Sequence, residues 1–257
     1  MALLKSTGNK KVNLDFNKEF INTFSEKIEN ENIEFINQTL KDLHEADVAN
    51  LIENLNPSTR IKLIELESFN INPEIFIELN ESIQSDVLQL LSIDSIIKII
   101  KRLESDNALK ILENLEKDTK NKVLEKLPPK DKFLLEEGLS YPDDSAARIM
   151  QREFTAVPSN WTVGQTIDYV REDKDLPEEF LEIFIVDNDF KPIGTVPSSR
   201  VLRTSRDLKM SSIMIEMPVL ISANMDKEEV GHAFENYNLV SAGVVNKNNK
   251  LVGMITA

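Results

Sequence analysis

A spacing of 24 residues, repeated four times, is the feature that most constrains the fold of this chain. An apolar pair three residues apart recurs at this step, and a third apolar position follows each pair. The pairs are Ile52 and Leu55, Phe76 and Leu79, Ile100 and Leu103, and Leu124 and Leu127; the third positions are Leu63, Val87, Ile111 and Leu135. Each copy predicts one helix, a tight turn and a shorter helix. A single copy cannot bury its own apolar stripe but stacked copies can, so the pattern predicts an α-superhelical array over residues 40–140.

Helix-capping residues lie between the apolar sets. Asn56 precedes Pro57 and Asn72 precedes Pro73, which places a side-chain acceptor before a residue suited to the first helical turn. Residues 1–39 are richer in polar residues and predict a helical segment in front of the array. The alternative to an array is a compact bundle with an accidental spacing, and four copies at one fixed step favour the array.

The second half of the chain has a different pattern, with short β-branched runs between prolines and single glycines. Strand candidates occur in two sets of three, which are 154–157, 182–187 and 192–196, and then 218–222, 241–246 and 251–256. Each set surrounds a helix that opens with a capping-box pair, Thr162 with Gln165 and then Asp226 with Glu229. We therefore predict a tandem of two small α/β units that pair to bury their sheets, since each unit alone is too small to be very stable.

Composition excludes several function classes. The formal net charge of −14 is spread along the chain, with 26 acids and 18 bases in residues 1–140 and 18 acids and 12 bases in the remainder. Such a surface repels nucleic acid and attracts divalent cations, although acidity can also serve solubility alone. The chain has no cysteine, and His44 and His232 stand far apart, so we expect no thiolate site and no His-rich metal site.

Catalytic and membrane signatures are also lacking in the sequence. It contains no phosphate-binding glycine motif, no zinc-protease motif and no evident nucleophile–base pair, so we expect a protein that is not an enzyme. No apolar run reaches the roughly 20 residues of a membrane-spanning helix, and the first residues are too weakly apolar for a signal peptide. We expect a soluble chain.

Three separated stretches carry a family resemblance. They are "LHEADVANLIENLNPSTRIKLIELE" (43–67), "YPDDSAARIMQREFTAVPSNWTV" (141–163) and "MDKEEVGHAFENYNLVSAGVVNKNNKLVGMIT" (225–256). In this order they resemble the cytoplasmic region of MgtE-type magnesium transporters. "DDSAARIM" is similar to the family's "xDSAGRLM", with Ala147 at the usual glycine position. The α/β tandem by itself resembles a pair of CBS domains, regulatory modules that often bind adenine nucleotides.

The resemblance implies an α+β multidomain protein. Residues 1–39 would form a helical segment, 40–140 the superhelical N domain, 141–207 the first CBS domain and 208–257 a second CBS domain that lacks its last helix. Residues 141–163 would be the hinge between the N domain and the CBS pair. The resemblance further implies a homodimer formed through the CBS domains. It also implies a membrane-embedded pore domain after Ala257, and hence an inner-membrane protein with this part on the cytoplasmic side.

A role in sensing Mg²⁺ is also implied by the resemblance. It points to Glu74 and Asp106 in the N domain, and to Asp226 and Asp187 in the CBS pair, as candidate Mg²⁺ ligands. Mg²⁺ binds carboxylates and water in octahedral geometry, and acidic faces of two domains would repel one another until a dication bridges them. The alternative is that acids near helix starts, such as Glu74, only stabilise the helix N-terminus.

Three positions depart from the acids of the family. Lys110 stands one helical turn after Asp106, Asn224 stands two residues before Asp226, and Asn246 ends the strand that corresponds to the one ending at Asp187. The acidic network is therefore thinner than the resemblance implies.

A nucleotide is the other ligand that the resemblance implies. CBS domains place Ser or Thr three residues before an Asp that binds ribose, and "GTVPSSRVL" (194–202) has Arg200 at the Asp position, while the second copy keeps Thr256. Arg200 would face a phosphate of ATP or make a surface salt bridge. Two other functions therefore stay open beside magnesium sensing: a CBS module that responds to nucleotides, and a helical-repeat scaffold that binds a protein partner.

Overall fold

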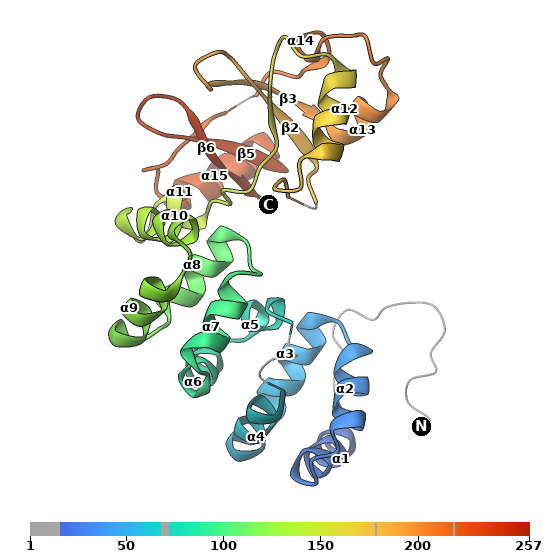
Figure 1. Ribbon diagram of the computed structural model, residues 1–257, viewed down its shortest axis with the longest axis vertical. Helices are drawn as coiled ribbons and strands as arrows, with labels where there is room; N and C mark the ends of the chain where they lie inside the picture. Colours follow the sequence, from blue (N-terminus) through green and yellow to red (C-terminus); the bar gives the residue numbers. More distant parts are fainter. Residues whose placement is uncertain (1–15, 68–71, 178, 218) are drawn as a thin grey trace. The chain divides into compact units, whose positions relative to one another are not determined.

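The computed structural model describes residues 16–67, 72–177, 179–217 and 219–257. The chain separates into two compact units (Figure 1). Unit 1 comprises the chain up to Leu103 together with Lys110–Leu127, and unit 2 comprises Glu104–Leu109 and Pro128–Ala257. The chain therefore crosses between the units three times, and one of these crossings lies within the helix α8 (Ser105–Glu113).

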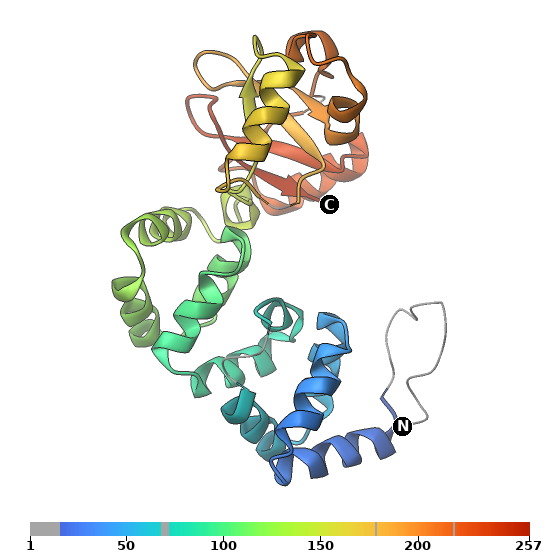
Figure 2. The same cartoon turned by 45° about the vertical axis from the view of Figure 1, so that its right-hand side comes forward.

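Unit 1 is entirely α-helical in the part that the structure describes. Its helices are α1 (Lys18–Glu29), α2 (Ile33–Lys41), α3 (Glu45–Asn54), α4 (Pro57–Glu67), α5 (Glu74–Glu78), α6 (Glu81–Leu90), α7 (Ile93–Ile100), the second part of α8, and α9 (Lys117–Lys126). The helix α10 (Pro129–Ser140) belongs to unit 2. Contacts join α3 to α5, α4 to α6 and α7 to α9, so that equivalent helices of successive copies stack (Figure 2).

The predicted repeat is confirmed. Every one of the twelve apolar positions is buried except Leu103, which is half-buried. The copies are α3 with α4, α5 with α6, α7 with α8, and α9 with α10. The prediction that the second helix of each copy is the shorter one is wrong, since it is the longer one in every copy. The predicted cap is confirmed at Asn56, whose side chain accepts from the Thr59 amide at 2.9 Å. It is wrong at Asn72, because α5 begins at Glu74 with Pro73 as its N-cap, although the Asn72 side chain accepts from the Glu74 amide at 3.3 Å.

Unit 2 contains two three-stranded sheets with the same topology. The first module has β1 (Ala156–Pro158), α12 (Val163–Glu172), β2 (Glu182–Val186), β3 (Pro192–Pro197) and α13 (Ser198–Arg203), and the second has β4 (Ile221–Ser222), α15 (Lys227–Tyr237), β5 (Ser241–Val245) and β6 (Leu251–Thr256). In each module the first strand runs parallel to the second, and the second runs antiparallel to the third. The predicted tandem of α/β units is therefore confirmed.

The two helix starts of the modules differ in their caps. Thr162 and Gln165 form the predicted capping box, with each side chain bound to the backbone of the other residue. Asp226 is the predicted N-cap of α15, but its carboxylate accepts from the amide of Glu228 at 2.8 Å. The bond is to the second amide of the helix and not to that of Glu229, so the capping-box prediction is wrong at this start.

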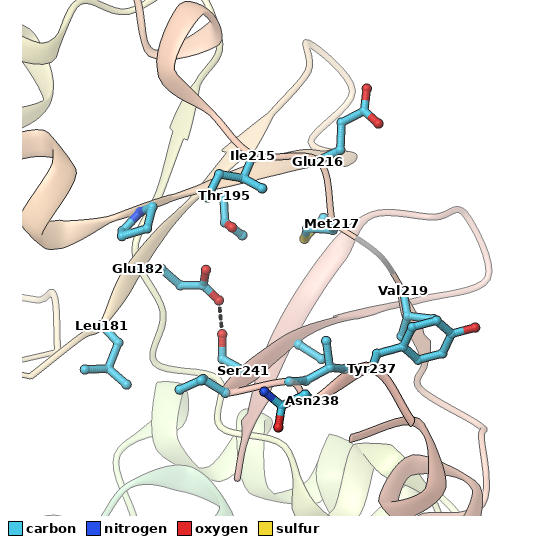
Figure 3. A pocket seen from close by; sticks show the side chains of 14 residues that line it. Leu181, Glu182, Thr195, Ile215, Glu216, Met217, Val219, Tyr237, Asn238 and Ser241 are labelled. Atoms are coloured by element: carbon cyan, nitrogen blue, oxygen red, sulfur yellow. Dashed lines mark hydrogen bonds between the residues drawn. The ribbon is translucent and has the colours of Figure 1, made fainter. Parts of the chain in front are cut away.

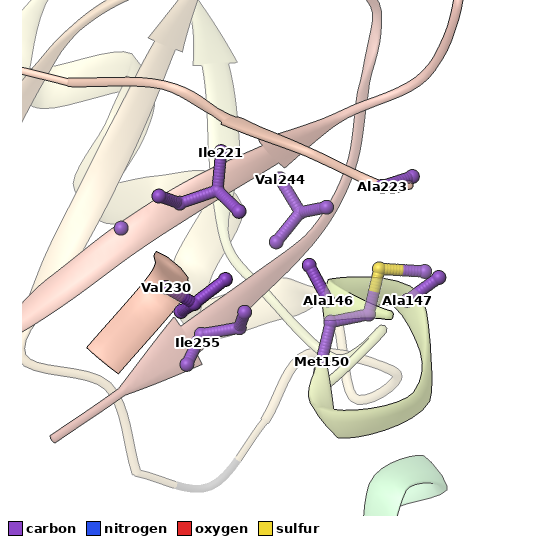
Figure 4. Packing of buried hydrophobic residues seen from close by; sticks show 9 residues of the cluster. Ala146, Ala147, Met150, Ile221, Ala223, Val230, Val244 and Ile255 are labelled. Atoms are coloured by element: carbon purple, nitrogen blue, oxygen red, sulfur yellow. The ribbon is translucent and has the colours of Figure 1, made fainter. Parts of the chain in front are cut away.

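The short helices α11 (Ala146–Ile149) and α14 (Met210–Ile213) are exchanged between the modules. Ala146, Ala147 and Met150 are fully buried in the core of the second module, against Val244 and Ile255 (Figure 4). In turn, Met210 is buried in the core of the first module. Backbone pairs complete the exchange: Gln151 with Met254, both bonds 2.8 Å, and Ile215 with Thr195, at 2.8 and 2.9 Å. Residues 141–163, predicted as a hinge, therefore lie inside unit 2.

Two glycines make the exchange possible. A Cβ atom on Gly194 would lie 2.7 Å from the carbonyl oxygen of Ile215, and a Cβ atom on Gly253 would lie 2.7 Å from that of Gln151. The exchanged segments thus approach the third strand of each sheet at a distance that only glycine permits. This contact explains the single glycines in "PIGTV" and "LVGMIT".

Candidate functional site

The four acids predicted to bind Mg²⁺ lie at the ends of helices and strands. In unit 1, Glu74 is the first residue of α5 and is exposed. In unit 2, Asp106 lies half-buried in the first turn of α8, and Asp226 caps α15 with its side chain exposed. Asp187 follows β2 and is half-buried. In the described part of the chain, no three acidic, cysteine or histidine side chains gather closely enough to hold a metal ion.

The position of Asp106 is set by a polar cluster at the start of α8. The carboxylate of Glu153 accepts from the backbone amide of Ser105 at 3.2 Å and from its hydroxyl at 2.8 Å. The neighbouring Arg152, with a side chain only 9% exposed, donates to Glu137 of α10 at 2.7 Å. Because the Glu153 carboxylate satisfies the first amide of α8, it fixes the turn that carries Asp106.

Asp187 serves the β2–β3 turn. Its Oδ1 accepts from the amides of Asp189 and Lys191, both at 2.9 Å. Asn246 makes the same contacts in the β5–β6 turn, with the amides of Asn248 at 2.9 Å and Lys250 at 3.1 Å. Since one neutral side-chain oxygen is enough for this role, an Asn replaces an Asp here without loss of the turn.

The other two departures from the family's acids, Lys110 and Asn224, are both exposed. Lys110 lies in the last turn of α8, where a positive charge is favoured by the helix dipole. Asn224 lies two residues before the Asp226 cap.

The two residues predicted to bind a nucleotide do not meet. Arg200 lies exposed on α13, and its guanidinium donates to the backbone carbonyl of Ile213 at 2.9 Å. Thr256 lies exposed at the end of β6, opposite Ser241 of β5. Neither residue is among those that line the cavity between the two modules.

That cavity, of about 410 Å³, is the site that the sequence did not reveal (Figure 3). Its apolar walls include Leu181, Ile215, Val219 and Val240. It is built from the ends of β2 and β3 in the first module, the segment between the modules, and the turn that joins α15 to β5. Both modules are therefore needed to form it.

Glu182 is the central polar group of this cavity. Its carboxylate accepts a short hydrogen bond from the hydroxyl of Ser241, a residue of the other module (Figure 3). Burial raises the pKa of Glu182, and a hydrogen bond from Thr195 opposes this rise. A charged side chain that opens an otherwise apolar strand, "EIFIV", was the one signal in the sequence that marked this position.

These elements define a class of protein, a helical repeat domain joined to a pair of CBS-type α/β modules. Residues 43–144 match the family model of the MgtE intracellular N domain, and residues 210–257 match the model of the CBS domain. The resemblance of the sequence to the cytoplasmic region of MgtE-type proteins is therefore confirmed.

Individual relatives agree with this assignment. The chain is 25% identical over 118 residues to the magnesium transporter MgtE of Bacillus subtilis, which covers 46% of this chain and 26% of that protein. It is 24% identical over 128 residues to MgtE of Thermus thermophilus, which covers 50% of this chain and 28% of that protein. The chain thus spans about a quarter of the length of the curated relatives it matches.

Solved structures show the same fold. The cytosolic domain of the Mg²⁺ channel MgtE in complex with ATP has a TM-score of 0.82 at 21% identity, over 92% of this chain and 96% of that one. The soluble part of a magnesium transporter has a TM-score of 0.78 at 20% identity, over 93% and 94%. None of the helices in the described residues has the length and apolarity needed to cross a membrane.

Proposed function

We propose that this chain is the Mg²⁺-sensing cytoplasmic region of an MgtE-type magnesium transporter or channel. In this proposal Mg²⁺ draws the N domain and the CBS pair together, and the closed arrangement shuts the ion path of a pore domain in the inner membrane. The protein acts as a homodimer through its CBS domains. The observation that carries the proposal is the pairing of an MgtE N domain with a CBS domain in one strongly acidic chain.

The proposed switch depends on electrostatic repulsion between carboxylates, which a bound Mg²⁺ relieves. Two carboxylates about 4 Å apart repel by roughly 4 kcal/mol at an effective dielectric constant near 20. Monovalent salt screens only beyond about 8–10 Å, so close acidic pairs need a bridging dication. Glu74 and Asp226 are exposed at helix starts, where a carboxylate keeps room for Mg²⁺ and its water ligands. Asp106 is the third proposed ligand, while Asp187 is engaged in its turn.

Small-angle X-ray scattering tests this proposal. We expect the radius of gyration of the whole chain to fall when millimolar Mg²⁺ is added at constant ionic strength, and to stay unchanged when Na⁺ is added instead. The matched variant combines Glu74→Gln, Asp106→Asn and Asp226→Asn, and the new side chain at residue 226 can still cap α15. Compaction that persists in this variant, or that fails in the wild type, contradicts the proposal.

A second candidate function is a CBS module that responds to a nucleotide. The cavity between the modules favours it, together with the fold shared with an MgtE cytosolic domain whose structure contains ATP. Calorimetric titration with ATP and AMP, in the presence and absence of Mg²⁺, separates the two candidates. Nucleotide binding without any effect of Mg²⁺ on compactness would favour the second.

A further inference from the structure

A buried arginine lies where the last helices of the repeat meet the α/β modules of unit 2. The side chain of Arg152 is only 9% exposed, and its Nη1 atom donates to the carboxylate of Glu137 on α10 at 2.7 Å. The Nε and Nη2 atoms of Arg152 are also buried, and no described residue provides them with a hydrogen-bond partner. A guanidinium withdrawn from water in this way depends on its one carboxylate, because removal of that partner would leave an uncompensated buried charge.

The backbone at Arg152 is bound to the start of α8. The Arg152 amide donates to the hydroxyl of Ser105 at 2.9 Å and to the carboxylate of Glu153 at 3.2 Å. The same carboxylate accepts from the amide and from the hydroxyl of Ser105. Ser105 is the first residue of α8 and Asp106 is the second, so this segment fixes the turn on which a proposed Mg²⁺ ligand lies.

The side chain of Arg152 closes these contacts into a ring of three segments. Glu137, its partner, is followed in α10 by Gly138, and a Cβ atom on Gly138 would lie 2.6 Å from the side chain of Leu109 in α8. The helix α10 is therefore bound to Arg152 at one residue and packs against α8 at the next. The residue before Arg152 pairs with β6, so the ring is attached to the second module.

We infer that Arg152 is a positioning residue for the response to Mg²⁺, an inference that rests on the proposed function. Its guanidinium is a resident cation that holds Glu137 and α10, and through them it keeps the start of α8, with Asp106, in place on the second module. Mg²⁺ then meets a carboxylate that is already ordered. Because ordering a ligand beforehand reduces the free-energy cost of binding, less Mg²⁺ is needed for the response.

A magnesium titration followed by small-angle scattering separates positioning from charge. Arg152→Gln removes a positive charge, which by electrostatics alone would lower the Mg²⁺ concentration at half-maximal compaction. Loss of positioning should instead raise this concentration by about tenfold, the effect of one lost hydrogen bond between charged groups. Glu137→Gln should raise it equally. The double variant should respond like either single one, because each change removes the same bond.

A second measurement is independent of Mg²⁺. In Mg²⁺-free buffer, hydrogen exchange of the backbone amides of residues 105–109 should be about tenfold faster in Arg152→Gln than in wild type, while the amides of β2 exchange at the wild-type rate. Arg152→Lys keeps a donor for the one bond that is made. It should bring both the exchange rate and the Mg²⁺ concentration at half-maximal compaction to within about threefold of wild type.

The matched control is Arg206→Gln, which breaks an ion pair of the same length in the first module. Arg206 Nη2 lies 2.7 Å from the Asp168 carboxylate, but both side chains are more than half exposed. This control should change neither the exchange of α8 nor the response to Mg²⁺. Thermal unfolding establishes that each variant is folded, and Glu137→Gln replaces Arg152→Gln in both measurements if the latter does not fold.

The outcomes distinguish the positioning role from the proposed function. If the wild type does not compact with Mg²⁺, the proposed function fails, and the exchange of α8 alone decides whether Arg152 holds the start of this helix. The inference is overturned if Arg152→Gln leaves the exchange of α8 unchanged. It is also overturned if, in a protein that compacts, Arg152→Gln lowers the required Mg²⁺ concentration or leaves it unchanged.

Discussion

Arg60 and Gln84 occupy the same position in successive copies of the 24-residue unit, and both close the end of the preceding helix. Arg60 Nε donates to the carbonyl of Ile52 at 2.9 Å, and Gln84 Nε2 donates to the carbonyl of Phe76 at 2.6 Å. The two acceptors are themselves 24 residues apart. Both donors are buried, Gln84 completely. The repeat therefore includes a polar position that the apolar pattern did not reveal.

Removal of this bond should destabilise the array. We expect Gln84→Leu to lower the free energy of unfolding by about 2 kcal/mol, because the buried carbonyl of Phe76 loses its side-chain donor and Asn114 loses its acceptor. Urea unfolding followed by circular dichroism measures the change. The control is Gln89→Leu on the exposed side of the same helix α6, which should change stability by less than about 0.5 kcal/mol. Equal effects of the two variants would contradict the role of Gln84.

Alanine substitutions at two glycines of unit 2 should have opposite effects on its stability, because only one of these glycines lies at the close approach of an exchanged segment. In Gly253→Ala, the new Cβ atom meets the Gln151 carbonyl at 2.7 Å, and we expect a loss of about 1–3 kcal/mol in stability. In Gly231→Ala, no atom lies within 4 Å of the new Cβ in helix α15, and we expect a gain of about 0.5–1 kcal/mol. Thermal unfolding of the two variants beside the wild type checks the opposite signs. A stable Gly253→Ala protein would show that the close approach can relax.

The pH dependence of stability should carry the signature of Glu182. Because burial raises the pKa of this carboxyl above its ordinary value, the folded state binds its proton more tightly than the unfolded state does. The contribution of Glu182 to stability is therefore greatest at low pH, and it is lost as the pH rises from the ordinary pKa of a glutamate through the raised one. We expect Glu182→Gln to gain stability relative to wild type over this window. Urea unfolding of both proteins between pH 4 and pH 7 gives the difference directly, and a difference that does not change with pH would contradict it.

An acid restored at residue 110 should strengthen the response to magnesium. Lys110→Asp places a carboxylate one turn after Asp106 and removes a positive charge, which together favour a bound dication. We expect the Mg²⁺ concentration at half-maximal compaction to fall by about tenfold, since two units of charge change close to the site. Small-angle scattering during a magnesium titration measures it. The control Lys122→Asp makes the same charge change at an exposed position of α9. It should leave the Mg²⁺ concentration at half-maximal compaction unchanged.

Local patterns in the sequence determined the helical array, the succession of strands and helix along both modules and most helix starts. Periods of 24, 3.6 and 2 residues reflect which side chains a helix or strand must bury, and they are visible without any distant contact. The same reasoning placed caps at Asn56, Thr162 and Asp226, because a cap involves only residues within one turn. The amide that donates to the Asp226 carboxylate is that of Glu228 and not the predicted one of Glu229, since nothing in the sequence distinguishes these two amides.

Tertiary structure alone decided the exchange of α11 and α14 and the cavity around Glu182. The exchange depends on contacts such as that of Gln151 with Met254, and the cavity on that of Glu182 with Ser241, both between residues far apart in the chain. Two nearly equivalent modules offer each short helix two similar sheets. The sequence shows that such a helix needs an apolar partner, but the choice between the two sheets is made by packing and by glycine at the point of closest approach.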